Sequence, residues 1–86
     1  MSASSCVPHI GPILRRLRLG RGMTQTALAE ASGIRQNYVH YIERGLRVPA
    51  LDVLENVCRA LGSSTSAVLS EAEKACEEQL LAEKTS

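Results

Sequence analysis

The chain has 86 residues, of which 44% are hydrophobic and 22% charged, a composition that suits one globular domain with an aliphatic core. No apolar run approaches the roughly 18 residues of a membrane span, and the first residues have neither the basic start nor the apolar stretch of a secretion signal. The net charge of +1 hides an asymmetry. Residues 1–60 hold eight arginines against four acidic residues, a net +4, and residues 61–86 hold two lysines against five glutamates, a net −3. The basic part indicates an anionic partner on one side, while chance solvated charge is the alternative.

Three cysteines lie far apart in the chain. Their odd number and the lack of a C-x-x-C pair indicate neither a disulfide framework nor a zinc site. This usage is typical of a reducing cytoplasm, which is the expected location. Cys58 and Cys76 fall at helical apolar spacings, and we expect both in the core, with pairing of Cys76 across a dimer as the alternative.

The predicted elements are all helices, and the first is indicated by apolar residues on one face: Ile10, Ile13, Leu14 and Leu17. Pro12 suits its first turn, and Gly20 ends it. A second helix over 25–31 follows Thr24, which is a good N-cap. Gly33 then supplies the left-handed residue that lets the chain leave this helix.

A third helix begins within two residues of Gly33 and ends at Gly45. Arg35 stands at its N-cap, where it is a poor cap, which suggests another use for this side chain. A fourth amphipathic helix follows the loop "LRVPA" and runs from Leu51 to Leu61. Ser64 caps a fifth short helix. The capping box S-x-x-E over residues 70–73 predicts a last helix that starts near residue 71.

Residues 24–45, "TQTALAEASGIRQNYVHYIERG", have the pattern of a helix-turn-helix, in which a short turn containing glycine joins two helices. Ala29 fits the point where two such helices come close. When Val39 is set at the centre of the buried face of the third helix, Glu43 also faces inward. The outward face then carries the hydrogen-bonding side chains Gln36, Asn37, Tyr41 and Arg44, flanked by Tyr38 and His40.

This outward face suits a helix that enters the major groove of DNA, because amide, guanidinium and phenol groups can match the donors and acceptors of base edges. Arg35, Arg44 and Arg47 can neutralise phosphates. An ordinary solvated helix is the alternative, and the helix-turn-helix context favours DNA.

Three stretches in this order resemble the lambdoid phage repressor and Cro type of helix-turn-helix, often called the XRE family: "ILRRLRLGRGMTQTALAEASGI", "YIERG" and "VPALDVLENVCRALGSS". The resemblance covers roughly residues 10–69. It implies an all-α fold, a compact five-helix repressor-like bundle, to which this chain adds a C-terminal extra helix. It also implies operator binding as a dimer.

By matching position, the resemblance places base reading at Gln36, Asn37 and Tyr41, with His40 as a weaker candidate. It implies a structural ion pair between Arg18 and Glu43. Together with the outward face described above, it gives these candidate contacts to the DNA backbone: Gln25, Arg35, Tyr38, Arg44 and Arg47. Leu46 and Val48 depart from the family pattern, because basic residues are common there, so a thinner grip on phosphates is expected.

We expect three segments: a flexible N-terminal arm over residues 1–9, a DNA-binding domain over 10–70, and a C-terminal helix with a frayed end over 71–86. Apolar residues recur along the end of the chain, and we expect them in a dimer interface: Leu69, Ala72, Cys76 and Leu80. Folding of this helix onto its own domain is the alternative.

The sequence therefore predicts a sequence-specific transcriptional regulator, most simply a repressor or autoregulator, that binds an inverted-repeat operator in double-stranded DNA as a homodimer. The alternative is a helical protein-interaction module, such as an antitoxin or adaptor, with little DNA binding. An enzyme is disfavoured, because His9 and His40 have no cysteine or carboxylate at a nucleophile or metal spacing. We expect no cofactor, metal, small-molecule ligand or membrane partner.

Overall fold

The computed structural model describes residues 9–85, and the side chains of residues 9–78. Over that range the chain forms five helices and no strand: α1 (Ile10–Gly20), α2 (Gln25–Ser32), α3 (Gln36–Glu43), α4 (Leu51–Ala60) and α5 (Thr65–Thr85). The expected all-α five-helix fold is confirmed. The expected N-terminal arm lies almost wholly outside the described residues.

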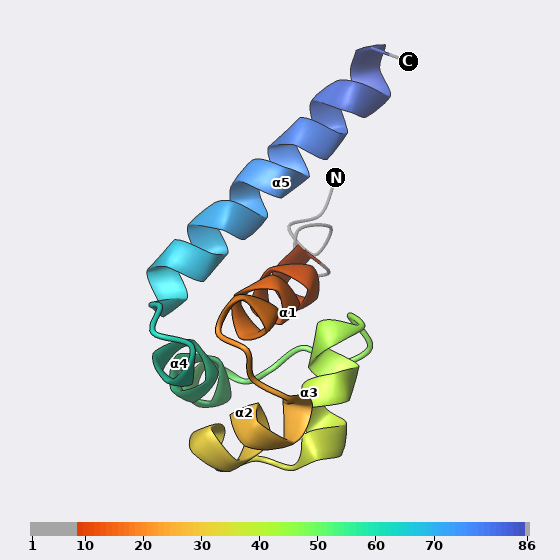
Figure 1. Cartoon of the computed structure of the whole chain (residues 1–86). Helices are drawn as coiled ribbons and strands as arrows, with labels where there is room; N and C mark the ends of the chain where they lie inside the picture. Colours follow the sequence, from red (N-terminus) through yellow and green to blue (C-terminus); the bar gives the residue numbers. More distant parts are fainter. Residues whose placement is uncertain (1–8, 86) are drawn as a thin grey trace.

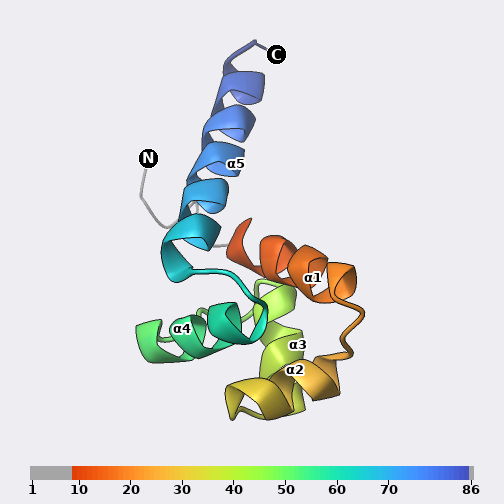
Figure 2. The same ribbon diagram turned by 60° about the vertical axis from the view of Figure 1, so that its left-hand side comes forward.

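The helices α1 to α4 form a bundle from which α5 leads away (Figures 1 and 2). Helix α1 contacts both α3 and α5, and α2 contacts both α3 and α4. The helix-turn-helix formed by α2 and α3 therefore lies at one end of the molecule, and the C-terminal part of α5 lies at the other. The molecule measures 42 × 22 × 19 Å along its principal axes.

The core is aliphatic, as the composition predicts, and draws on all five helices. Its buried members are Ile10, Ile13, Leu14, Leu28, Ala29, Val39, Ile42, Leu54, Val57, Cys58, Leu61, Val68 and Ala72. Cys58 and Cys76 are both buried, as expected. Cys58 is a free thiol, whereas Cys76 is disulfide-bonded, so the expectation of no disulfide is wrong for Cys76. An odd cysteine count and wide spacing in the sequence do not exclude a pair that the fold brings together.

The C-terminal region differs from expectation, because the predicted fifth and last helices are one continuous helix, α5. Ser64 caps it as predicted, since its Oγ accepts a hydrogen bond from the Ala67 amide at 3.1 Å. The chain has no glycine or proline in the following turns. The buried side chains of Val68, Ala72 and Cys76 recur every four residues, so a single face stays packed and the helix continues through the capping box.

The N-terminal turn of α1 lies against the last turn of α3 at Gly11. A Cβ atom added at this position would lie 2.4 Å from the carbonyl oxygen of Ile42 and 2.7 Å from that of Glu43. Because both neighbours are backbone atoms, no side-chain movement relieves this contact. Gly11 therefore sets how closely α1 approaches α3, a role that sequence analysis did not assign to it.

Candidate nucleic-acid interface

The turn between α2 and α3 has the backbone geometry that the sequence predicts. Thr24 accepts a hydrogen bond from the Ala27 amide at 3.0 Å and so caps α2. Gly33 has φ of 72° and ends the helix in the left-handed conformation. The Ile34 amide then donates to the carbonyl oxygen of Ala29 at 3.0 Å, which fixes the direction in which α3 begins.

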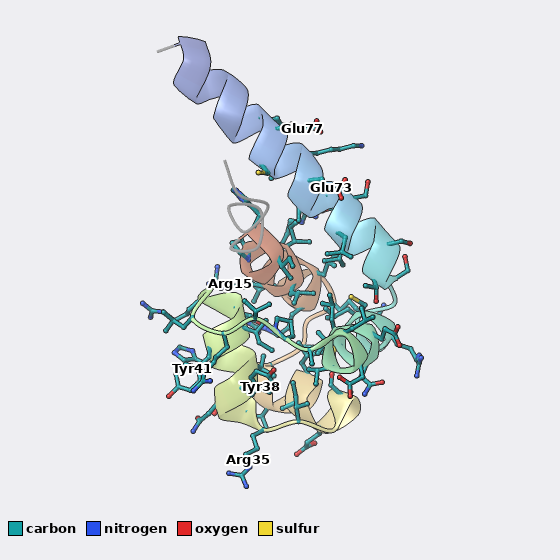
Figure 3. All side chains as sticks on the ribbon, turned by 180° about the vertical axis from the view of Figure 1, so that it is seen from behind. Arg15, Arg35, Tyr38, Tyr41, Glu73 and Glu77 are labelled. Atoms are coloured by element: carbon teal, nitrogen blue, oxygen red, sulfur yellow. The ribbon has the colours of Figure 1, made fainter. Side chains whose placement is uncertain are left out.

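The two faces of α3 are those that the helical wheel predicts. Val39, Ile42 and Glu43 are buried. Gln36, Asn37, Tyr41 and Arg44 are exposed, and the flanking residues Tyr38 and His40 are half-buried. Arg35 gives no side-chain capping bond to α3, and its side chain projects from the N-terminal end of this helix (Figure 3).

The two tyrosines of α3 have different surroundings. Tyr38 packs partly against the hydrophobic core, whereas Tyr41 is 42% exposed. The rings of His40 and Tyr41 are tilted by 56°, with their centroids 5.8 Å apart. Tyr41 is thus the more accessible aromatic ring, and neighbouring His40 limits the directions in which it can turn.

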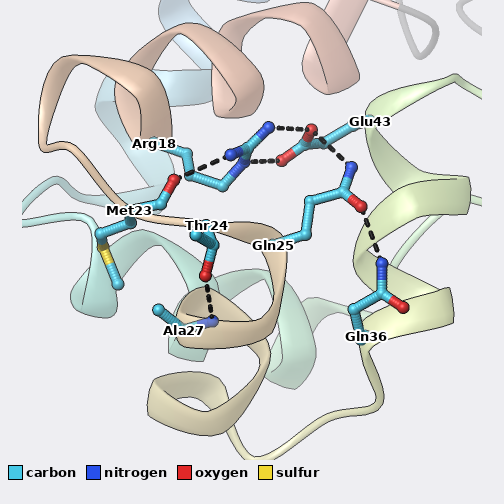
Figure 4. Close-up of polar contacts among 7 residues, drawn as sticks. All are labelled: Arg18, Met23, Thr24, Gln25, Ala27, Gln36 and Glu43. Carbon is cyan, nitrogen blue, oxygen red and sulfur yellow. Dashed lines mark hydrogen bonds and ion pairs between the residues drawn. The ribbon is translucent and has the colours of Figure 1, made fainter.

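A buried ion pair joins α1 to the end of α3 (Figure 4). Arg18 Nε donates to Glu43 Oε2 at 2.7 Å, and Arg18 Nη2 donates to Glu43 Oε1 at 3.0 Å. The same guanidinium donates through Nη1 to the carbonyl oxygen of Met23 at 2.8 Å, at the entry to α2. Both charged side chains are less than one-tenth exposed. This two-point bond therefore fixes the recognition helix relative to α1 and to the start of α2.

The ion pair continues outward through two amides (Figure 4). Gln25 Nε2 donates to Glu43 Oε1 at 3.2 Å, and Gln36 Nε2 donates to Gln25 Oε1 at 2.8 Å. Both glutamines were expected to contact DNA separately, and the bond between them was not predicted. Gln36 is thereby held at the exposed N-terminal tip of α3 with its carbonyl oxygen still unused by these bonds.

A surface hollow of about 350 Å³ lies beside α3. It is lined by Arg35, Asn37, Tyr38, Tyr41, Arg47 and Val48. Five of these residues are candidate DNA contacts from the sequence, and the structure brings them together around one space. Val48 was expected only to weaken the grip on phosphates, so its place in this lining is new. The other candidates Gln25, Gln36, His40 and Arg44 do not line the hollow.

The charges on this face are of one sign. Arg35, Arg44 and Arg47 are exposed there, and the one acidic residue of α3, Glu43, is buried against Arg18. Glu73 and Glu77 lie on α5, away from the helix-turn-helix (Figure 3). Three exposed arginines therefore lie at α3 and its ends, and the two labelled glutamates of α5 lie away from them.

Helix α5 is tied to its own domain along its first half. Ala72 and Cys76 are 2% and 4% exposed, and Leu69 is 37% exposed. Arg16 of α1 forms an ion pair with Glu71 of α5. Two of the four residues expected at a dimer interface are thus covered within the chain, one remains accessible, and the side chain of Leu80 lies outside those described.

The described residues also bear on metal binding and on membrane insertion. No group of three or more His, Cys, Asp or Glu side chains within that part of the chain is placed to hold a metal ion. None of the described helices is both long and apolar enough to cross a membrane.

Comparison with known proteins gives consistent matches. The helix-turn-helix family HTH_3 matches residues 14–68. The immunity repressor protein of Bacillus phage phi105 is 37% identical over 70 residues, which are 81% of this chain and 49% of that protein, so the chain spans about half of its length. The crystal structure of the clp gene regulator ClgR from Corynebacterium glutamicum superposes with a TM-score of 0.84 at 35% identity and covers 93% of this chain and 85% of that one. The restriction–modification controller protein C.Esp1396I, solved as a tetramer with its natural 35-base-pair operator, has a TM-score of 0.73 at 26% identity and covers 88% of this chain and 97% of that one.

Proposed function

The chain belongs to the helix-turn-helix family HTH_3, and from this premise we propose that it is a sequence-specific DNA-binding transcriptional regulator rather than an enzyme. In this proposal it acts in the cytoplasm as a homodimer on an inverted-repeat operator, most simply as a repressor or autoregulator. The observation that carries the proposal is the outward face of α3, where hydrogen-bonding side chains and cations are exposed together.

In the proposed complex α3 enters the major groove, and its exposed amides and phenol read base edges through Gln36, Asn37 and Tyr41. The network behind Gln36 supports this role, because a side chain that is already held loses less conformational freedom on binding. His40 is half-buried beside Tyr41 and has less reach. We therefore assign it to orienting the Tyr41 ring.

The exposed arginines on this side contact the phosphates: Arg35, Arg44 and Arg47. Each neutralised phosphate contributes about −0.9 to the slope of log K against log salt concentration. Three contacts in each protomer of a dimer therefore predict a slope of about −5. Tyr38 and Gln25 are half-buried, so they suit contacts to the DNA backbone where the DNA comes close to the protein surface.

A twofold dimer places its recognition helices about 34–36 Å apart, which corresponds to one turn of DNA. We propose that residues 71–86 of α5 supply the dimer contact, together with Leu69, which is still accessible on the first part of the helix. Ala72 and Cys76 contribute to this interface indirectly, because they pack α5 against its own domain. The position of Glu73 and Glu77, away from the helix-turn-helix, keeps this acidic helix from repelling the phosphates (Figure 3).

The test is a fluorescence anisotropy titration of a labelled duplex from immediately upstream of the gene, at several salt concentrations and with random-sequence competitor. Asn37→Ala and Tyr41→Ala should each lose sequence preference, with about 1–3 kcal/mol of discrimination removed per good contact, while circular dichroism shows an intact fold. Asn56→Ala is the matched control, because Asn56 is also an exposed helical asparagine but belongs to α4.

Salt-sensitive binding that resists competitor and is lost in the two α3 variants supports the proposal. If the upstream duplex binds no better than competitor, selection from a random duplex pool locates the operator. Failure to bind any duplex at low salt contradicts the proposal. It would favour the protein-interaction module instead. In that case variants of α5 such as Leu69→Ala should lose binding to the protein partner.

A further inference from the structure

Two apolar side chains are exposed among the arginines at the C-terminal end of α3. Leu46 and Val48 are 65% and 63% exposed, and both belong to the loop that follows α3. Only Val48 lines the hollow beside the helix, where it joins two tyrosine rings, one amide and two guanidinium groups. The hollow thus combines an apolar wall with cationic side chains.

This combination of groups suits a nucleotide better than a second copy of the chain. Arg35 and Arg47 line the hollow, and the acidic Glu43 nearby is buried and already paired, so two copies of this surface would repel each other. An anionic DNA strand is attracted by the same charges. The volume of about 350 Å³ lies within the range of roughly 300–1,000 Å³ that is usual for small-ligand sites. It is therefore large enough for a unit the size of a nucleotide.

The apolar wall indicates which base is preferred. In the major groove, the one apolar group that a base pair presents is the C5-methyl group of thymine. An exposed valine beside an exposed tyrosine ring loses water-accessible apolar surface when such a methyl group is placed against it. Cytosine carries only a hydrogen at C5, and guanine presents two acceptors, so neither base offers the valine a methyl group.

We propose that this hollow receives one strand of the operator, with a thymine methyl group against Val48 and the Tyr41 ring and the adjoining phosphates against Arg35 and Arg47. Val48 is then a specificity-determining residue that selects thymine at one position of each half-site. The inference rests on the proposed DNA-binding function and adds to it a preferred base and the residue that recognises it.

The experiment begins with selection of bound sequences from a random duplex pool by the wild-type protein. Each thymine of the selected half-site is then replaced singly by deoxyuridine, which removes only the methyl group, and affinities are measured by anisotropy. One position per half-site should weaken binding about fourfold, the factor expected for one buried methyl group. Val48→Ala should bind the thymine duplex less tightly and should distinguish thymine from deoxyuridine at that position by a clearly smaller factor than the wild-type protein does.

Leu46→Ala is the matched control, because Leu46 is equally exposed and lies two residues away but does not line the hollow. It should keep the wild-type ratio between the two duplexes. A selected site without any methyl-sensitive thymine overturns the inference while leaving the proposed function in place. Val48→Ala protein that keeps the full thymine preference also overturns it. If no sequence is enriched at all, the proposed function fails and the inference fails with it.

Discussion

Replacing Glu43 with leucine should remove much of the stability of this domain. The guanidinium of Arg18 would then be left buried without its carboxylate, since the side chains of Arg18 and Glu43 are only 8% and 3% exposed. Breaking a buried ion pair by removing one partner typically costs about 3–5 kcal/mol. The converse variant, Arg18→Met, leaves the carboxylate unpaired and should cost a similar amount.

This loss is large compared with the stability available. A chain of 86 residues has a free energy of unfolding of about 4–13 kcal/mol at ordinary values per residue. In a domain of this size each 1 kcal/mol shifts the melting temperature by about 4–8 °C. The single variants should therefore melt about 12–40 °C below the wild-type protein.

The unfolding free energies are measured by urea unfolding followed by circular dichroism. The double variant Arg18→Met/Glu43→Leu is included, so that the four proteins form a double-mutant cycle. The double variant should regain most of the loss, because an apolar pair of similar size leaves no charge buried. The reasoning is refuted if either single variant loses less than about 1 kcal/mol, the value of an exposed pair. It is also refuted if the double variant loses the sum of the two single losses.

Three further changes test other parts of the fold. Gly11→Ala should lower the unfolding free energy by about 1–3 kcal/mol through overpacking, since its Cβ would meet a carbonyl oxygen of α3 at 2.4 Å. Gly20→Ala, with open space around it, should raise the unfolding free energy by up to about 1 kcal/mol. Equal effects of the two substitutions in urea unfolding would contradict this account. Thr24→Ala should cost about 1 kcal/mol because the cap of α2 is lost, whereas Thr24→Ser should unfold at nearly the wild-type urea concentration. Burial raises the pKa of the Cys58 thiol above its usual 9.0, more than the hydrogen bond with Thr65 lowers it. The folded state then keeps this proton to a higher pH than the unfolded chain does, so this group's contribution to the unfolding free energy should hold steady below pH 9.0 and decline above it. Cys58→Ala should remove that part of the decline in a series of unfolding curves at rising pH, and an unchanged decline would show that other groups cause it.

The local parts of the fold could be predicted from the sequence because their causes are local. The cap at Thr24 and the left-handed glycine at Gly33 act within four residues, and the structure contains both. The faces of α3 follow from helical geometry once Val39 is taken as buried. These signals were sufficient to predict the helix-turn-helix and the exposed residues of its second helix.

Contacts between helices could not be predicted in the same way. Gly11 reads as an ordinary residue near a helix start, and its packing on the carbonyl of Ile42 depends on how the whole core sets the approach of α1. The bond between Gln25 and Gln36 depends likewise on the crossing of α2 and α3. Each glutamine alone looks like a side chain that is free to bind DNA.

The end of the chain shows a third case, in which a correct local pattern was outweighed. Ser70 and Glu73 match a capping box, yet they lie inside α5. The buried stripe through Val68 and Ala72 continues across this point. Because hydrophobic burial along the helix outweighs a capping preference of about 1 kcal/mol, the helix does not restart there.

The placement of both tyrosines on α3 makes the intrinsic ultraviolet emission of this protein a report on one surface. The chain has no tryptophan, so no stronger fluorophore masks the two phenols. Both rings line the same hollow, but Tyr38 is partly packed into the core and Tyr41 is the more exposed. Tyr41→Phe would leave Tyr38 as the only tyrosine, so a comparison with the wild-type protein would assign each part of an emission change to one of the two rings without any attached dye.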